Sequence, residues 1–124
     1  MLVHADVSFA VIGAAIEVHR QLGPGLLESA YEHCLCHELA LREIPFERQV
    51  ALPVRYKGLL LDCGYRLDMV VDRSVLLELK SVEQINKIHE AQLLSYLRLS
   101  DIRVGLLINF NVTNLRRGIV RRVV

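Results

Sequence analysis

Apolar side chains in the first third of the chain recur at the spacing of two helices. Between Val3 and Leu22 they fall three or four residues apart, which predicts an amphipathic helix over this range. Gly23-Pro24-Gly25 ends that helix, because proline cannot continue it and the glycines permit unusual backbone angles. A second helix is predicted from Leu26 to about Glu43, where a proline follows closely.

The middle of the chain changes to the pattern of strands. Phe46 to Tyr56 alternates between apolar and polar residues, and Lys57-Gly58 is a hairpin-type turn into a second strand, Leu59 to Cys63. Arg66 to Val71 predicts another strand. The run from Val75 to Lys80 is mostly aliphatic and lies between turn residues, which suits a strand covered on both faces.

The last third alternates helix and strand. A helix is predicted from Ile85 to Leu99 and a strand from Ile102 to Phe110, so the helix would form a crossover connection. Gly118 to Val124 predicts a final strand at a sheet edge. Taken together, the order predicts a single domain over residues 1–124 of the α/β class (α+β type), with helices flanking a central mixed sheet.

Three charged residues interrupt the two central strands. Side chains alternate along a strand, so Glu78 and Lys80 share one face while Leu77 and Leu79 share the other. Asp68 stands ten residues upstream, on the preceding strand. Two carboxylates can hold a hard cation, and a nearby ammonium can orient a water or offset negative charge. The alternative is an ordinary ion pair between Glu78 and Lys80 on a half-exposed face.

Two polar-tipped residues on the next helix favour the chemical interpretation. Gln92 and Tyr96 are four residues apart and therefore share one helical face. That face is otherwise apolar, so both side chains are expected to be near the sheet. Their alternative role is packing with satisfied polar ends.

These residues together resemble a known superfamily of nucleases. An Asp, then Glu-x-Lys, then a helix with Gln-x-x-x-Tyr is similar to the PD-(D/E)XK nucleases, although Leu67 stands where the motif has proline. Gly25-Leu26-Leu27-Glu28-Ser29-Ala30-Tyr31 resembles the signature of its GxxExxY family. The resemblance runs from about Val11 to the C-terminus.

The resemblance implies a restriction-endonuclease-like core and a role for each residue. Asp68 and Glu78 would bind Mg²⁺ or Mn²⁺ and Lys80 would be the catalytic lysine. Glu28 would be an additional acidic ligand, although helix-dipole stabilisation alone accounts for a glutamate in a first turn. Gln92 and Tyr96 would line the cleft. The implied activity is hydrolysis of phosphodiester bonds in DNA or RNA; the alternative is a binding or adaptor module that keeps the fold without turnover.

Composition limits the partners without choosing among them. The 124 residues are 52% hydrophobic and 23% charged, with a net charge of +1, so charge neither supports nor excludes a nucleic-acid partner. Arg116-Arg117 and Arg121-Arg122 form a basic cluster that suits either a solvated edge or a phosphate-binding rim. The short chain leaves little room for a recognition domain, which favours a homodimer or a partner protein.

The cysteines and apolar runs indicate the cellular setting. Three cysteines without an export signal predict reduced thiols in a cytoplasmic protein, and no apolar run is long enough to cross a membrane. His33 and His37 have the spacing of a shared metal site, but zinc needs four ligands and no second cluster supplies them. Solvated histidines beside buried Cys34 and Cys36 are the preferred interpretation.

Overall fold

The structure is a computed structural model that describes residues 4–124. Its elements, in chain order, are α1 (Ala5–Leu22), α2 (Glu28–Leu41), β1 (Phe46–Ala51), β2 (Val54–Tyr56), β3 (Leu59–Leu61), β4 (Arg66–Val71), β5 (Val75–Lys80), α3 (Lys87–Ser100), β6 (Val104–Asn109), the 3₁₀ helix η1 (Leu115–Gly118) and β7 (Ile119–Val123). The predicted start of the first helix at Val3 lies outside the described residues.

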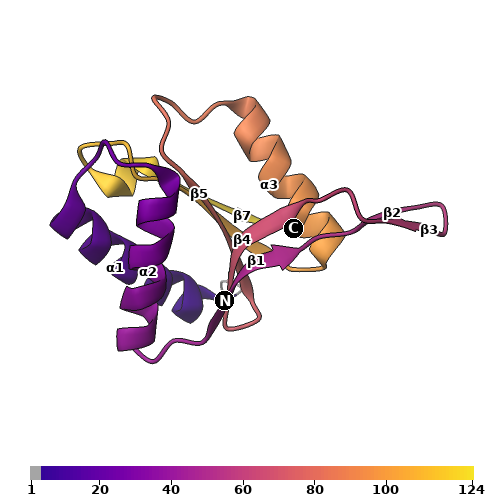
Figure 1. The fold of residues 1–124 in the computed structure, drawn as a ribbon, viewed down its shortest axis with the longest axis horizontal. Coiled ribbons are helices and arrows are strands. Elements are labelled where there is room, and N and C mark those ends of the chain that lie inside the picture. The colour runs from indigo at the N-terminus through magenta and orange to yellow at the C-terminus, as the bar shows by residue number, and fades with distance from the viewer. Residues whose placement is uncertain (1–3) are drawn as a thin grey trace.

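A five-stranded mixed sheet forms the centre of the molecule (Figure 1). The strand order is β1-β4-β5-β6-β7, in which β5 and β6 are parallel and every other neighbouring pair is antiparallel. Helix α3 connects the parallel pair, so the predicted crossover is confirmed. Strand β7 lies at one edge, also as predicted.

Two apolar layers cover opposite faces of this sheet. Helices α1 and α2 pack on one face around the fully buried Val11, Tyr31 and Leu77. Helix α3 packs on the other face through Leu93 and its neighbours (Figure 1). Strand β5 contributes to both layers, which explains its nearly continuous aliphatic sequence.

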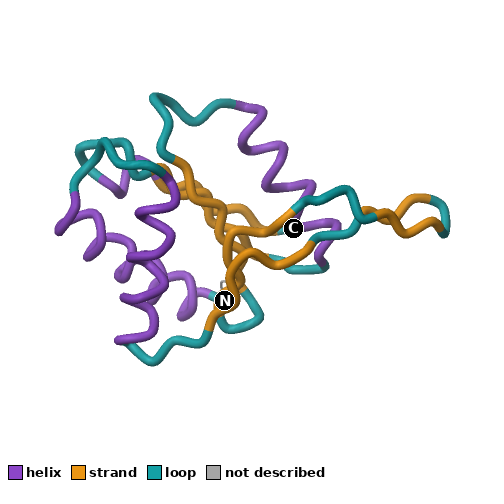
Figure 2. The backbone as a smooth tube through the Cα atoms, in the orientation of Figure 1, coloured by secondary structure: helices purple, strands orange, loops and turns teal. Residues whose placement is uncertain are grey.

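The predicted single strand from Phe46 to Tyr56 is wrong. It divides at Leu52-Pro53, and its second part pairs with β3 in a separate two-stranded hairpin that projects from the body (Figures 1 and 2). Proline has no N–H for a sheet ladder, and the Leu52 N–H donates to the Tyr65 carbonyl, where the hairpin rejoins β4.

Glycine is required where other groups come close to the sheet and its flanking turn. A Cβ on Gly105 in β6 would meet Leu93 and Leu97, so the glycine lets α3 pack close to the strand. A Cβ on Gly118 would fall inside van der Waals distance of the Asn109 carbonyl.

Within residues 4–124, no helix is both long and apolar enough to cross a membrane.

Candidate active site

The central strands separate where the predicted carboxylates lie. The β4–β5 ladder pairs Val71 with Val75 and continues to Met69 and Leu77, so Asp68 and Glu78 would form the next pair. Their side chains bond to the opposite backbone instead. The Leu79 N–H donates to Asp68 Oδ2 at 2.7 Å, and the Asp68 N–H lies 3.4 Å from Glu78 Oε1. The two carboxyl groups therefore occupy one opening between the strands.

Burial and mutual repulsion make this carboxyl pair unstable when fully charged. Glu78 is only 5% exposed, and burial, followed by the charge of Asp68, raises its pKa to about 8. Burial also raises the pKa of Asp68, against the opposing hydrogen bond from Leu79. The pair on its own therefore retains a proton near neutral pH, and a bound cation would remove that requirement.

Lys80 lies within electrostatic range of both carboxylates. Its positive charge lowers the pKa of Asp68 and of Glu78, partly offsetting the effect of burial. Leu77 and Leu79 pack in the layer under α1 and α2, so Glu78 and Lys80 point away from that layer, as the alternation predicts. Lys80 is half-buried, which leaves its ammonium group access to solvent.

Helix α3 places Gln92 and Tyr96 one turn apart, but only Tyr96 is buried as predicted, and Gln92 is exposed. Burial, then the charge of Glu78, raises the pKa of Tyr96, while a hydrogen bond with Gln92 opposes the shift. The two residues line an open pocket of about 530 Å³ together with Tyr65 and His89. The Tyr65 and Tyr96 rings lie 6.0 Å apart and are tilted by 57°. Neither carboxylate lines this pocket, and its relation to them is through Tyr96, which lies within electrostatic range of both Glu78 and Asp68.

The Gly-x-x-Glu-x-x-Tyr segment ties the loop before α2 to the end of β5. Tyr31 stacks on Phe110 with ring centroids 4.4 Å apart, and its hydroxyl donates to the Gly23 carbonyl at 2.6 Å. The Ser81 hydroxyl donates to the Leu26 carbonyl at 2.6 Å, and the Ser81 N–H donates to Glu28 Oε2 at 3.3 Å. Glu28 is therefore exposed and accepts a hydrogen bond from the backbone of the residue that follows Lys80.

Glu32, which the sequence analysis did not identify, is a carboxylate whose charge acts on Asp68. Glu32 is 7% exposed, and its charge contributes to the raised pKa of Asp68. Arg48 Nη2 and Gln49 Nε2 donate to its two oxygens at 2.6 and 2.8 Å. Its position four residues after Glu28, and so on the same helical face, was the available signal.

The backbone of β1 is distorted beside this network. Gln49 has φ of +52°, which is uncommon for a side chain other than glycine within a strand. The β1–β4 ladder pairs Arg48 with Met69 and Val50 with Leu67, and it skips the Gln49–Asp68 pair between them. Strained residues persist where surrounding contacts hold them, and here the bond to Glu32 does so.

The donor set fits a magnesium-type ion more closely than zinc. Within residues 4–124, no three His, Cys, Asp or Glu side chains converge as a ready metal cage. Magnesium commonly takes one or two protein carboxylates and fills its remaining positions with water and substrate phosphate, as Asp68 and Glu78 would allow. His33 and His37 line a separate pocket. The prediction that Cys34 and Cys36 are buried is wrong for Cys34, which is exposed, and Cys36 is half-buried.

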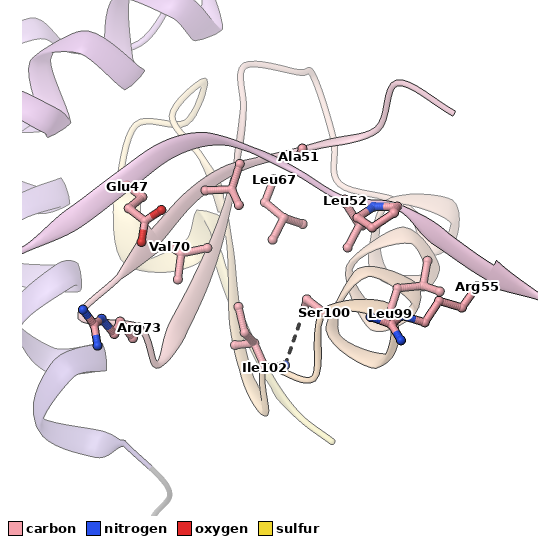
Figure 3. A pocket seen from close by; sticks show the side chains of 12 residues that line it. Glu47, Ala51, Leu52, Arg55, Leu67, Val70, Arg73, Leu99, Ser100 and Ile102 are labelled. Atoms are coloured by element: carbon pink, nitrogen blue, oxygen red, sulfur yellow. Dashed lines mark hydrogen bonds between the residues drawn. The ribbon is translucent and has the colours of Figure 1, made fainter. Parts of the chain in front are cut away.

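A further hollow lies between β1, β4 and the C-terminal end of α3 (Figure 3). It has a volume of about 340 Å³ and mainly aliphatic walls. Glu47 and Arg73 lie at one end of the view and Arg55 at the other. It includes neither carboxylate of the site and is a separate feature.

The sheet order, the two helical layers and the splayed central strands define a restriction-endonuclease-like fold. A family model described as the PD-(D/E)XK nuclease superfamily matches residues 5–123. The chain therefore belongs to the PD-(D/E)XK nuclease superfamily. No curated protein and no solved structure matches the chain significantly.

Proposed function

We propose that this chain is a divalent-metal-dependent nuclease of the GxxExxY type that hydrolyses phosphodiester bonds in DNA or RNA. One observation supports the proposal above all: the buried carboxyl group of Glu78 and the half-buried carboxyl group of Asp68 share an opening in the sheet within electrostatic range of Lys80. Burying like charges together is costly. A bound cation would offset the repulsion between the two carboxylates and so explain why they lie together, which an ordinary ion pair with Lys80 would not explain.

Asp68 and Glu78 would hold Mg²⁺ or Mn²⁺, with Glu28 as the additional acidic residue from the start of α2. The ion, when bound, would lower the pKa of a coordinated water and offset negative charge on the phosphate. Because Glu28 bonds to the Ser81 N–H, we infer that it acts at the rim of the site.

The remaining residues would position the substrate and manage charge. The Lys80 ammonium would orient the attacking water and stabilise the negative charge that develops on the phosphoryl oxygens. The Gln92 amide and the Tyr96 hydroxyl would contact the phosphate from the α3 side. Glu32, Arg48 and Gln49 would act indirectly, by fixing the strand opposite Asp68.

Cleavage assays on single- and double-stranded DNA and RNA, with Mg²⁺, Mn²⁺ or EDTA, test this proposal. Glu78→Ala should reduce metal-dependent cleavage by about 100-fold or more, the scale expected for loss of a charge-stabilising group. The matched control is Glu38→Ala, which removes a half-buried α2 carboxylate paired with Arg42 and should stay within about twofold of wild type.

Two outcomes would contradict the proposal. Equal cleavage by wild type and Glu78→Ala would indicate a contaminating enzyme. Metal binding and nucleic-acid binding without turnover on any substrate would indicate the alternative, a binding module that keeps the nuclease fold.

A further inference from the structure

The β2–β3 hairpin has one face made entirely of apolar side chains. Its register pairs Val54 with Leu61 and Tyr56 with Leu59, and directly paired residues of an antiparallel ladder share a face. We call these four residues the arm face. The remaining pair, Arg55 and Leu60, occupies the opposite face.

The arm face is uncovered in a single chain. Tyr56, Leu59 and Leu61 are 61%, 55% and 40% exposed, and the hairpin extends away from the body (Figure 1). An isolated two-stranded hairpin is marginally stable in water. An exposed apolar arm of this kind is typical of a segment that packs against a partner.

The arm face continues into a hollow on the same chain. Val54, at the base of the arm, also lines the 530 Å³ pocket that Tyr65 and α3 form, which we call the α3 pocket. Ile88, on the wall of this pocket, is 70% exposed, and Tyr65 is 45% exposed. A projecting apolar arm and an open, largely apolar hollow therefore lie next to each other.

We propose that two copies of this chain associate through a twofold axis, with the arm face of each copy packed in the α3 pocket of the other. A twofold interface needs a self-complementary surface, which an adjacent projection and hollow provide. The accessible area of the arm face, added to that of Tyr65 and Ile88, is roughly 500–600 Å² per copy. Burying this area on both copies would just exceed the ~1,000 Å² expected of a specific interface.

Chemistry favours a second copy over nucleic acid as the occupant. The four residues of the arm face carry no charge, and one cation, the Lys57 ammonium, lies 5.4 Å from the centroid of the Tyr56 ring. Nucleic-acid affinity depends on several cations placed against phosphates. A net charge of +1 also produces little repulsion between two copies. The α3 pocket includes Gln92 and Tyr96, so the partner's arm would lie beside the candidate active site.

Molar mass in solution, measured by sedimentation velocity between roughly 1 and 200 μM, tests the proposal, since an interface of this size predicts a concentration-dependent dimer. Wild type should approach twice the chain mass of 14.1 kDa as concentration rises. Leu59→Asp on the arm face and Ile88→Asp in the α3 pocket should each weaken dimerisation at least tenfold. The matched control is Leu60→Asp, which adds the same charge to the same strand on the opposite face and should dimerise like wild type.

Three results would overturn the proposal: a monomeric wild type over the whole range, equal dissociation by Leu59→Asp and Leu60→Asp, or an unaffected dimer in Ile88→Asp. A monomer whose nucleic-acid affinity falls with Leu59→Asp would assign the arm to nucleic acid instead. Far-ultraviolet circular dichroism verifies that each variant is folded. Glu78→Ala should remain dimeric, so failure of the nuclease proposal leaves this test unaffected.

Discussion

Replacing Glu78 by glutamine should make the protein more stable at alkaline pH and leave it nearly unchanged at pH 4.5. The pKa of Glu78 is about 8 in the folded protein against an ordinary value of 4.5. Between these values the folded protein keeps a proton that the unfolded chain releases. The unfolding free energy of wild type therefore falls as pH rises from about 4.5 to about 8, and then levels off. Glutamine carries no titrating proton, so the part of this fall that Glu78 causes should disappear, and only the smaller part from the raised pKa of Asp68 should remain.

The size of the effect follows from the two pKa values. A tenfold change in proton affinity corresponds to about 1.4 kcal/mol, so the upper limit is about 5 kcal/mol. Local relaxation and water entry reduce this limit, and we expect a gain of about 2–4 kcal/mol for Glu78→Gln at pH 9. For a chain of 124 residues this corresponds to roughly 8–15 °C in melting temperature.

Urea unfolding of wild type and Glu78→Gln at several pH values between 4.5 and 9, without divalent cations, measures the difference directly. Glu83→Gln removes the same charge from an exposed position nearby and should change stability by less than about 0.5 kcal/mol at every pH. A wild type whose stability relative to Glu78→Gln stays constant or rises over this range would refute the assignment of a buried, repelled carboxyl pair.

Adding Mg²⁺ extends the same experiment to the metal. An ion that binds only the folded state stabilises it by about 2.7 kcal/mol at 100 times its dissociation constant. Wild type at pH 8–9 should therefore recover much of its deficit, while Glu78→Gln should gain far less. Equal stabilisation of both proteins would place the bound ion away from Glu78.

Three further predictions concern the supports of the site and the fold. Glu32→Gln weakens the charged hydrogen bonds to Arg48 and should cost about 1–3 kcal/mol in urea unfolding; an unchanged midpoint would contradict its structural role. Gly118→Ala places a methyl group against a backbone carbonyl and should lower the unfolding free energy by about 3 kcal/mol or more. Its control, Gly13→Ala, has room for the methyl group inside a helix and should raise the unfolding free energy by about 0.5–1 kcal/mol. Similar melting temperatures of the two variants would contradict the packing at Gly118. Tyr31→Phe keeps the ring but removes two hydrogen bonds to the loop before α2, so it should lower the free energy of thermal unfolding by about 1–2 kcal/mol. An unchanged melting temperature would show that these two bonds do not stabilise the loop.

Sequence periodicity predicted the central part of the fold correctly. Strand β5 was bounded at Val75 and Lys80, as in the structure, because a strand buried on both faces has an unbroken aliphatic run. The α3 crossover followed from a helix lying between two such runs. The helix ends were less accurate: α2 starts at Glu28 rather than Leu26, because Leu26 and Leu27 belong to the loop that bonds to Tyr31 and Ser81.

Two features depended on long-range contacts that periodicity does not contain. The hairpin leaves the sheet after Leu52, whose N–H still bonds to the carbonyl of Tyr65, thirteen residues later, because Pro53 has no N–H to continue the ladder. Glu32 resembles an ordinary solvated glutamate in an amphipathic helix. Its burial depends on Arg48 and Gln49, sixteen and seventeen residues away in β1. Neither partner can be identified from local spacing.

The position of the site follows from the same interactions that interrupt the sheet. A regular ladder would bond the backbones of β4 and β5 at Asp68 and Glu78 and would leave no space between them. The carboxylates take over those backbone donors, and β1 loses its pair opposite Asp68 where Gln49 adopts a positive φ. The β4 segment at Asp68 therefore lacks regular pairing on both sides: the β1–β4 ladder resumes at Leu67, whereas the β4–β5 ladder ends at Met69 and Leu77. Such an arrangement opens a polar site at the end of the β4–β5 ladder, while β5 stays paired with β6 along its whole length.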